Sequence, residues 1–336
     1  MGIADSDSLA NRPPAFQYTF YNTQGRGFAT AYGAYAVSYG SVYIPSAWQT
    51  SAGPASNRRT DLWTVLSPAT GGDTCTASNC NLFPIISFSN ADGADPLNAG
   101  ANGRFRVFDG NSASVDGWND LAAAVNYDNW NDVCTVFNGV DVKVYVNGVL
   151  GYTMTDLTQG DNSFGPPTLY SRVMVEAYNF GGANWTANWS GVGAGQLSTS
   201  SVDAGSNQSA AIGAAFGQPL AVTVLDSDGS PLPCAPVTFT APASGPGASL
   251  STTTVLTGRD GVARATAMAN GQAGNYEIGV SVNGVAETPF ELNNVASVRS
   301  ALPPAPVPAN APWALATLGA LLVLFTALVR RRRGAH

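Results

Sequence analysis

The segment Trp130–Met154, whose sequence is WNDVCTVFNGVDVKVYVNGVLGYTM, decides the fold class of this chain. β-Branched and aromatic residues dominate it, and apolar side chains recur at every second position, as one face of a β-strand requires. Two Asn-Gly pairs, Asn138-Gly139 and Asn147-Gly148, interrupt the pattern. Asn-Gly favours the two-residue type I′ turn of a hairpin, because both residues tolerate positive φ. The segment therefore predicts three consecutive antiparallel strands.

The two turns determine which side chains share a face of the sheet. Two-residue turns pair Phe137 with Val140 and Val146 with Val149, and alternate residues then point the same way. One face is apolar, so we expect it to line a core. It carries Val133, Thr135, Phe137, Val140, Val142, Val144, Val146 and Val149.

The opposite face is mixed, and two interpretations of it are open. It carries Asp132, Cys134, Val136, Asp141, Lys143, Tyr145, Leu150 and Tyr152. Such a face is usually solvated or covered by loops. Alternatively it binds a saccharide, with tyrosine rings stacking on sugar rings and charged groups bonding to hydroxyls. The residues of that candidate site are Asp132, Lys143, Tyr145 and Tyr152.

Residues 16–198 are expected to form one all-β domain, preceded by a disordered or truncated stretch at 1–15. Strand-like runs alternate with loops rich in Gly, Asn and Asp, and no stretch keeps a helical period. The clearest runs are Ser41–Pro45, Leu82–Phe88 and Arg104–Phe108.

This domain resembles the laminin-G and concanavalin A-like jelly rolls. The resemblance rests on Trp130-Asn131, the hairpin Val142–Leu150, Val173–Phe180 and the aromatic segment Asn184–Trp189, which follow one another in the same order in that superfamily. It implies a jelly-roll sandwich of two sheets. The superfamily contains lectins, adhesion modules and glycoside hydrolases, so the resemblance alone does not determine the function.

The residues of this domain give catalysis and cofactors little support. Family 16 glycoside hydrolases of this fold carry a Glu-x-Asp-x-x-Glu strand, but the one glutamate here, Glu176, has no acid two or five residues on. The only histidine of the chain is His336, which removes histidine-dependent triads. Calcium is the one metal to weigh, because oxygen ligands cluster in a Gly-rich loop, although loop formation explains them more simply. These residues are Asn90, Asp92, Asp95 and Asn98.

Two of the four cysteines lie close together in the sequence, and the other two are far from them and from each other. Cys75 and Cys80 lie in one polar loop and are expected to form a small disulfide in an oxidising compartment. Cys134 lies in a strand pattern and Cys234 between two prolines. We expect these two to be unpaired thiols rather than a bridge between domains.

Residues 199–294 are expected to form a second β-sandwich. Alternating strands, Asp-Gly turns and the pair Asn283-Gly284 indicate an immunoglobulin-like fold. The order and spacing resemble the bacterial immunoglobulin-like group 1 domain of intimin and invasin proteins, which implies a rigid spacer without chemistry of its own. The matching residues are Asp226, Gly229, Pro231, Val237, Phe239, Asp260, Gly261 and Ala263.

The chain ends in a segment typical of a membrane helix. After a Pro- and Ala-rich linker at 295–311, residues 312–336 contain an uncharged stretch at 313–329 and an arginine run at 330–333. A helix of about 17 residues spans about 25 Å of a hydrocarbon core of about 30 Å, and Trp313 and the arginines can cover the difference. Arginines favour the cytoplasmic side, so we expect everything before Trp313 to lie outside the cytoplasm.

This tail resembles the bacterial IPTL-CTERM sorting signal, a relative of PEP-CTERM. The resemblance implies removal of the helix by an exosortase-type membrane protease and transfer of the protein to the cell surface. Ala309 and Asn310 stand where that family has Thr and Leu. A plain single-pass anchor in the lipid bilayer is the alternative. The matching residues are Val307, Pro308, Trp313, Arg330, Arg331, Arg332 and Arg333.

Charge and export complete the prediction. The chain has 15 Lys and Arg against 22 Asp and Glu, and the tail holds four of the positive residues, so the remainder is acidic and unsuited to nucleic acid. Residues 1–8 lack the basic and apolar regions of a signal peptide, so we expect the true start upstream. We therefore predict an exported protein of the cell envelope, displayed at the surface, that binds a glycan or another extracellular polymer. A passive structural component and a polysaccharide-active enzyme are the alternatives.

Overall fold

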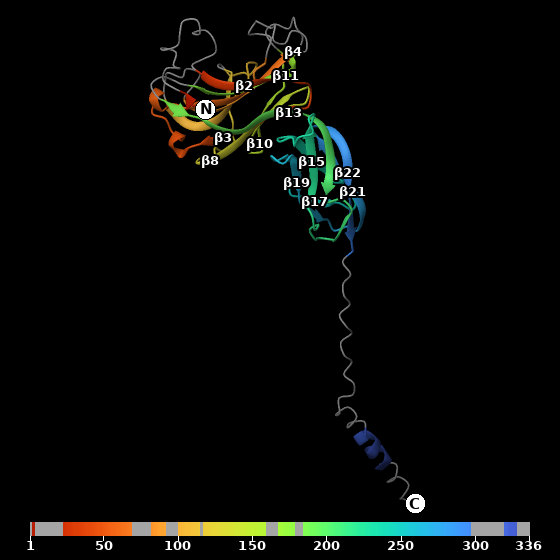
Figure 1. Cartoon of the computed structure of the whole chain (residues 1–336). Coiled ribbons are helices and arrows are strands. Elements are labelled where there is room, and N and C mark those ends of the chain that lie inside the picture. The colour runs from red at the N-terminus through yellow and green to blue at the C-terminus, as the bar shows by residue number, and fades with distance from the viewer. Residues whose placement is uncertain are drawn as a thin grey trace, which may run out of the picture. The chain divides into compact units, whose positions relative to one another are not determined.

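The computed structural model describes residues 2–3, 23–68, 82–91, 100–114, 117–158, 167–178, 184–296 and 319–327. These residues are almost all in strands or the turns between them, which confirms the predicted all-β class (Figure 1). The chain divides into two compact units, Met1–Val295 and Ala296–His336.

Two antiparallel sheets begin the first unit. The six-stranded sheet has the order β2-β11-β4-β5-β6-β7, and the seven-stranded sheet has the order β10-β9-β8-β3-β13-β15-β19. Strands β1 (Gly2–Ile3) and β12 (Trp185–Thr186) form a separate pair. The strands that make up the first sandwich are β2 (Thr23–Tyr32), β3 (Ala36–Ile44), β4 (Arg59–Pro68), β5 (Ile85–Ala91), β6 (Gly100–Phe108), β7 (Trp118–Asp120), β8 (Asn129–Phe137), β9 (Val142–Val146), β10 (Val149–Met154), β11 (Pro167–Tyr178) and β13 (Asn188–Ala204).

Apolar side chains from both sheets meet between the two layers. Leu62, Phe88 and Phe105 of the six-stranded sheet are buried in one cluster with Val133 and Val144 of the seven-stranded sheet. Burying each such side chain contributes about 1.5–3 kcal/mol. The first domain is therefore the two-layer sandwich that the sequence predicts, and its membership of the jelly-roll family stays a prediction.

The rest of the first unit is a second β-sandwich. One layer of this sandwich is a five-stranded sheet of order β14-β22-β21-β16-β18. The other layer is formed by β15 and β19 of the seven-stranded sheet, and a shared apolar core lies between the two layers. Phe239, Ile278 and Phe290 are fully buried in this core with Leu220 and Val222 of β15. The strands are β14 (Gln208–Ala211), β15 (Leu220–Asp226), β16 (Pro236–Thr240), β17 (Ala248–Leu250), β18 (Thr254–Leu256), β19 (Val262–Ala265), β20 (Ala267–Ala269), β21 (Gly274–Val282) and β22 (Val285–Val295).

Strand β13 belongs to both sandwiches. Its first part pairs with β3 and its later part with β15, so the predicted boundary after residue 198 lies inside one strand. The two cores are also continuous, because Val37 and Val136 of the first sandwich are buried in the same cluster as Leu232 and Val237 of the second. The two sandwiches therefore share backbone hydrogen bonds and apolar packing.

A disulfide between Cys134 and Cys234 joins the two sandwiches, with 6.5 Å between the Cα atoms. The prediction of two unpaired thiols is wrong. Strand β8 directs Cys134 to the face that the second sandwich covers, and Cys234 precedes β16 with a φ of 61°. The two residues are 100 positions apart and meet only because β13 continues from one sandwich into the other. The predicted Cys75–Cys80 pair lies outside the described residues.

The two Asn-Gly turns differ from each other. Asn147 and Gly148 both have positive φ (51° and 78°), which confirms the predicted type I′ turn. At the first turn Phe137 pairs with Val142, not with Val140, so the loop holds four residues. The Asn138 side chain accepts the backbone N–H groups of Val140 and Asp141 and closes this wider loop. Two added residues preserve the period of two, so the predicted core face of β8 and β9 is confirmed. Val140 and Val149, which are also predicted on this core face, are exposed, because both lie at the turns.

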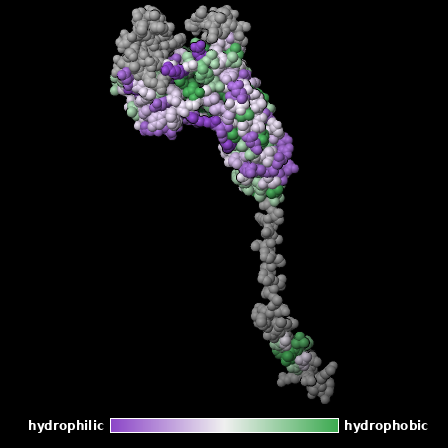
Figure 2. Space-filling model, in the orientation of Figure 1, coloured by the Kyte–Doolittle hydropathy of each residue, from purple (hydrophilic) through white to green (hydrophobic). Residues whose placement is uncertain are grey.

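In the second unit, residues 319–327 are helical and mostly hydrophobic (Figure 2). Among the described residues, no helix reaches the length and apolarity that crossing a bilayer requires. The other residues of the predicted span 313–329 and the residues of the sorting signal lie outside the described residues, so the membrane helix stays a prediction.

Candidate functional site

The residues predicted to bind a saccharide do not share one exposed face. Tyr145 is 6% exposed and packs in the core that both sandwiches share, and burial raises its pKa. A bulge between Leu150 and Tyr152 places Tyr152 opposite Val144, on the core side, where its hydroxyl donates to Asp109. A shift of one residue reverses the face of every side chain that follows. The side chains of Asp132 and Lys143 keep 65% and 37% of their surface exposed.

The loop considered for calcium is described only at its start. Asn90 is fully buried, and its amide oxygen accepts the N–H of Arg58 while its amide nitrogen donates to the carbonyl of Trp48. This side chain closes the loop between β3 and β4. Asp92, Asp95 and Asn98 lie outside the described residues, and the described part of the chain contains no cluster of three or more His, Cys, Asp or Glu that could hold a metal.

The outer face of the six-stranded sheet, which points away from the core, carries polar side chains in two rows. The first row crosses five strands, because each member lies opposite the next in the ladder: Glu176, Asp61, Ser87, Arg106 and Asp120. The second row runs parallel to it, one step along each strand: Tyr178, Arg59, Ser89 and Arg104. We call these nine residues the polar band.

An apolar row borders the polar band on its other side. Trp63 lies opposite Met174 on one side and Ile85 on the other, and Ile85 is followed by Phe108 and Trp118. The rings of Phe108 and Trp118 are 5.4 Å apart. This face of the sheet therefore carries hydrogen-bonding groups and flat apolar groups side by side, most of them buried.

Two glycines on β2 leave room for Glu176, which ends the first row of the polar band, and for Met174, which ends the apolar row. Gly25 lies opposite Glu176, and a Cβ on Gly25 would be 3.0 Å from the Glu176 Cγ atom. Gly27 lies opposite Met174, and its Cβ would be 2.5 Å from the Met174 Cγ atom. These distances are at or below the limit of ordinary contact, so both long side chains extend over the glycine backbone.

Arg59 and Asp61 form the buried centre of the polar band. The Arg59 guanidinium donates to both oxygens of Asp61 at 2.7–3.1 Å, and the indole N–H of Trp63 donates to the same carboxylate at 3.1 Å. The guanidinium carbon also lies 4.5 Å from the ring centroid of Trp118 and 5.4 Å from that of Tyr178. A cation over an aromatic face is attracted by the ring quadrupole. These contacts tie the polar band to the apolar row.

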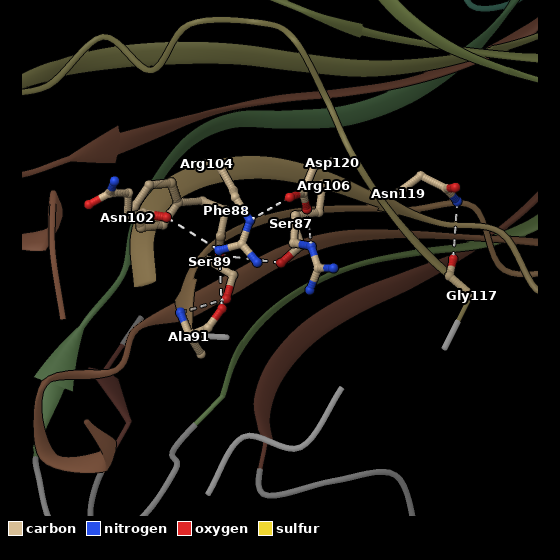
Figure 3. Close-up of polar contacts among 10 residues, drawn as sticks. All are labelled: Ser87, Phe88, Ser89, Ala91, Asn102, Arg104, Arg106, Gly117, Asn119 and Asp120. Carbon is tan, nitrogen blue, oxygen red and sulfur yellow. Dashed lines mark hydrogen bonds and ion pairs between the residues drawn. The ribbon is translucent and has the colours of Figure 1, made fainter. Parts of the chain in front are cut away.

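At the β7 edge, two arginines share the carboxylate of Asp120 (Figure 3). The Nε atom of Arg106 donates to one oxygen at 2.5 Å, and the Nε atom of Arg104 donates to the other at 2.9 Å. Arg104 also donates to the carbonyls of Ala91 and Asn102, and the Arg106 guanidinium lies 5.5 Å from the Trp118 ring. Each arginine is thus held in one orientation with Asp120 between them.

Exposure rises along the polar band toward Asp120. The side chain of Asp61 is 1% exposed, that of Arg106 is 10% exposed, that of Arg104 is 21% exposed and that of Asp120 is 55% exposed. Solvent therefore reaches the band at the β7 edge, where Trp118 is also partly exposed. The less exposed Arg106 and Arg104 hold the Asp120 carboxylate in place.

Sequence reasoning did not identify the polar band, although part of its signal is visible. Arg59, Asp61 and Trp63 occupy every second position of one strand, and the two arginines of β6 are also separated by one residue. Each strand alone looks like an ordinary half-buried strand. The band exists only because the ladder register aligns five strands from distant parts of the sequence.

Glu176, the glutamate weighed for catalysis, lies opposite Asp61 on the neighbouring strand. The spacing of acids along β11 does not predict this pair, because Asp61 belongs to β4. Asp61 accepts hydrogen bonds from Arg59 and Trp63, and these bonds hold Arg59 against Trp118. Asp61 therefore anchors the Arg59 side chain.

No protein-family model and no curated protein matches this chain. Among solved structures, the chain is similar to sheep galectin-11 in complex with glycerol, at 10% identity over 51% of this chain and 97% of that one, with a TM-score of 0.27. It is similar to a Bacillus licheniformis β-glucanase at 12% identity over 51% and 68% of the two chains, with a TM-score of 0.28. It is also similar to the carbohydrate-binding module CBM66 from Bacillus subtilis at 8% identity over 51% and 81%, with a TM-score of 0.25. Likeness at this level carries no argument about the site.

Proposed function

We propose that this protein binds a polysaccharide through the β7 edge of the polar band. The observation that carries this proposal is the adjacency of fixed charged groups, Arg104, Arg106 and Asp120, to the partly exposed ring of Trp118. A sugar ring has hydroxyls around its rim and C–H groups on its faces. It needs donors and acceptors in fixed positions together with a flat apolar surface, and this edge offers both.

The order imposed on these groups favours binding to an extended polymer. Asp120 and the two arginines hold one another in place, so their remaining donors and acceptors are oriented before a ligand arrives. Preorganised groups lose less conformational entropy on binding than flexible side chains do. An edge open on one side accommodates a chain that continues beyond the contact.

We further propose that the protein works outside the cytoplasm at the cell envelope. The disulfide between Cys134 and Cys234 supports this, because disulfides persist in oxidising compartments. Residues 319–327 expose Leu321, Leu322, Val323, Leu324 and Phe325, as a segment that meets lipid would. In this proposal the tail is an IPTL-CTERM sorting signal read by an exosortase-type protease, and the second sandwich is an immunoglobulin-like spacer that carries the binding sandwich.

An array of polysaccharides and oligosaccharides tests the binding proposal on the full chain. The proposal expects binding to at least one glycan and weaker binding of that glycan by the variant Asp120→Ala. Asp228→Ala is a matched control, because Asp228 is an exposed aspartate in a turn of the second sandwich. No binding to any glycan, in a chain that is folded, would favour the passive structural role. Release of new reducing ends from a bound glycan would favour the polysaccharide-active enzyme.

A further inference from the structure

The outer face of the seven-stranded sheet holds a second exposed cluster of aromatic and polar side chains. The ladder aligns Trp130 of β8, Tyr43 of β3 and Asn188 of β13 in one row. Trp130 is 43% exposed, and its ring meets that of Tyr43 edge to face at 5.7 Å between centroids. A large indole left this exposed on a sheet face, beside a second ring and an exposed amide, is suited to ligand contact.

The next row of the same face adds charged groups from both sandwiches. Asp132 lies opposite Ser41, and the Ser41 hydroxyl donates to the Asp132 carboxylate. Arg259, from the second sandwich, donates to the same hydroxyl at 2.5 Å and lies 3.9 Å from the carboxylate. The side chains of Asp132 and Arg259 stay 65% and 60% exposed, so both retain surface for a ligand. Their charges offset each other, which favours a neutral ligand.

A crevice continues from this row into the junction of the two sandwiches. It has a volume of about 280 Å³ and is lined by Ser41, Asp132, Pro231, Pro233, Cys234 and Arg259, among others. Ligand pockets for drug-sized molecules measure roughly 300–1,000 Å³, so this crevice suits a smaller unit such as one sugar ring. Its prolines provide an apolar wall opposite the polar groups.

The disulfide determines where Arg259 lies. Cys134 is two residues after Asp132 on the same face of β8, and its partner Cys234 donates its N–H to the carbonyl of Thr257, at the base of the turn that carries Arg259. Gly191 of β13 has a φ of 58°, and a Cβ there would lie 3.2 Å from the Arg259 Nη1 atom. The disulfide and these contacts hold Arg259 of the second sandwich beside Ser41 and Asp132 of the first.

From this arrangement we infer that Trp130, Tyr43, Asn188, Asp132 and Arg259 form a second saccharide site, separate from the polar band, for a neutral sugar unit. A sugar ring stacks on Trp130, and Asn188, Asp132 and Arg259 bond its hydroxyls or those of the next unit in the crevice. Only the ligand class rests on the proposed function. The location rests on the junction geometry.

Titration calorimetry of the full chain with soluble β-glucan, xylan and mannan oligosaccharides tests this inference. We expect two ligand sites per chain, with Trp130→Ala weakening one of them at least tenfold and Trp118→Ala weakening the other at least tenfold. Arg259→Gln, a milder change at an exposed side chain, should weaken the Trp130 site at least tenfold and leave the Trp118 site unchanged.

The outcomes separate this inference from the proposed function. If Trp130→Ala and Arg259→Gln bind with unchanged stoichiometry and affinity while Trp118→Ala loses binding, the second site does not exist and the polar band does. If Trp118→Ala has no effect and Trp130→Ala abolishes binding, the polar-band proposal fails and the junction site stands. Binding of none of these oligosaccharides by the folded chain would overturn the assignment of a neutral saccharide to this site.

Discussion

The hydroxyl groups of Thr135 and Tyr170 lie 2.9 Å apart in the centre of the first sandwich, where both residues are fully buried. Thr135 also bonds with Ser38 at 2.7 Å and Thr64 at 3.1 Å, so four hydroxyls from both sheets form one cluster inside an apolar core. Burial raises the pKa of Tyr170 far above its ordinary value. A neutral, satisfied hydroxyl cluster of this kind specifies how the two sheets align.

Removing Thr135 from this cluster should cost more than removing the Tyr170 hydroxyl. Thr135→Val leaves the Tyr170 hydroxyl buried without its partner, at a cost of about 1–3 kcal/mol, whereas Tyr170→Phe removes one hydrogen bond, at about 1 kcal/mol. The double variant should lose less stability than the sum of the two single losses, because it no longer contains a Tyr170 hydroxyl without a partner. Urea denaturation of the four proteins measures this. Strict additivity would mean that the two hydroxyls are not coupled.

The disulfide between the sandwiches should make a large contribution to stability. It closes a loop of 100 residues, and the chain-entropy estimate for such a loop is about 4.7 kcal/mol. Replacing Cys134 and Cys234 together with serine should therefore lower the free energy of unfolding by several kcal/mol. The test compares denaturation of the native chain and the double variant with and without reductant. Equal stability of the native chain and the double variant in the absence of reductant would show that the bridge does not form in solution.

A comparison of two glycines tests how closely the backbone packs in the segment that follows β13. Gly205 and Gly213 both have positive φ (94° and 78°), but a Cβ on Gly205 would lie 2.4 Å from the carbonyl oxygen of Pro219, while a Cβ on Gly213 meets nothing within 4 Å. Gly213→Ala should cost about 1–2 kcal/mol from backbone strain alone. Gly205→Ala should cost clearly more, because backbone cannot move aside as a side chain can. Similar melting temperatures for both variants would contradict this packing.

The sequence predicts the all-β class and the core face of β8 and β9, because both depend on the alternation of residues within single strands. Alternation in β8 and β9 fixes their core face even though the first turn is longer than predicted, because a change of two residues preserves the period. The bulge before Tyr152 has no comparable local signal, and it reverses the face of a predicted site residue. The disulfide and the polar band depend on which distant strands become neighbours, and single-strand patterns do not contain that information.

Alkaline pH should destabilise the protein through tyrosines that are buried or partly buried. Burial raises the pKa of Tyr276 to about 12, and burial likewise raises the pKa values of Tyr39 and Tyr145. An unfolded tyrosine titrates near pH 10. The folded chain therefore holds these protons more tightly, so its stability is complete below about pH 10 and falls as the pH rises through about 12.

Melting temperatures across this alkaline range measure the effect. Tyr276→Phe should show a shallower fall than the native chain, because one of the linked protons is absent. Exposed Tyr35, replaced by Phe, is the matched control and should follow the native curve. An identical pH dependence for native chain and Tyr276→Phe would show that Tyr276 titrates as it does in the unfolded chain.

The most direct measurement of the binding claim is calorimetric titration of the glycan selected on the array into three full-length proteins: native, Trp118→Ala and the control Asp228→Ala. Loss of one stacking ring at the site should weaken binding at the polar band by about 10- to 100-fold, since about 1.4 kcal/mol corresponds to tenfold. The control should bind as the native chain does. Native affinity and stoichiometry in a folded Trp118→Ala variant would contradict the assignment of this sheet face as the ligand site.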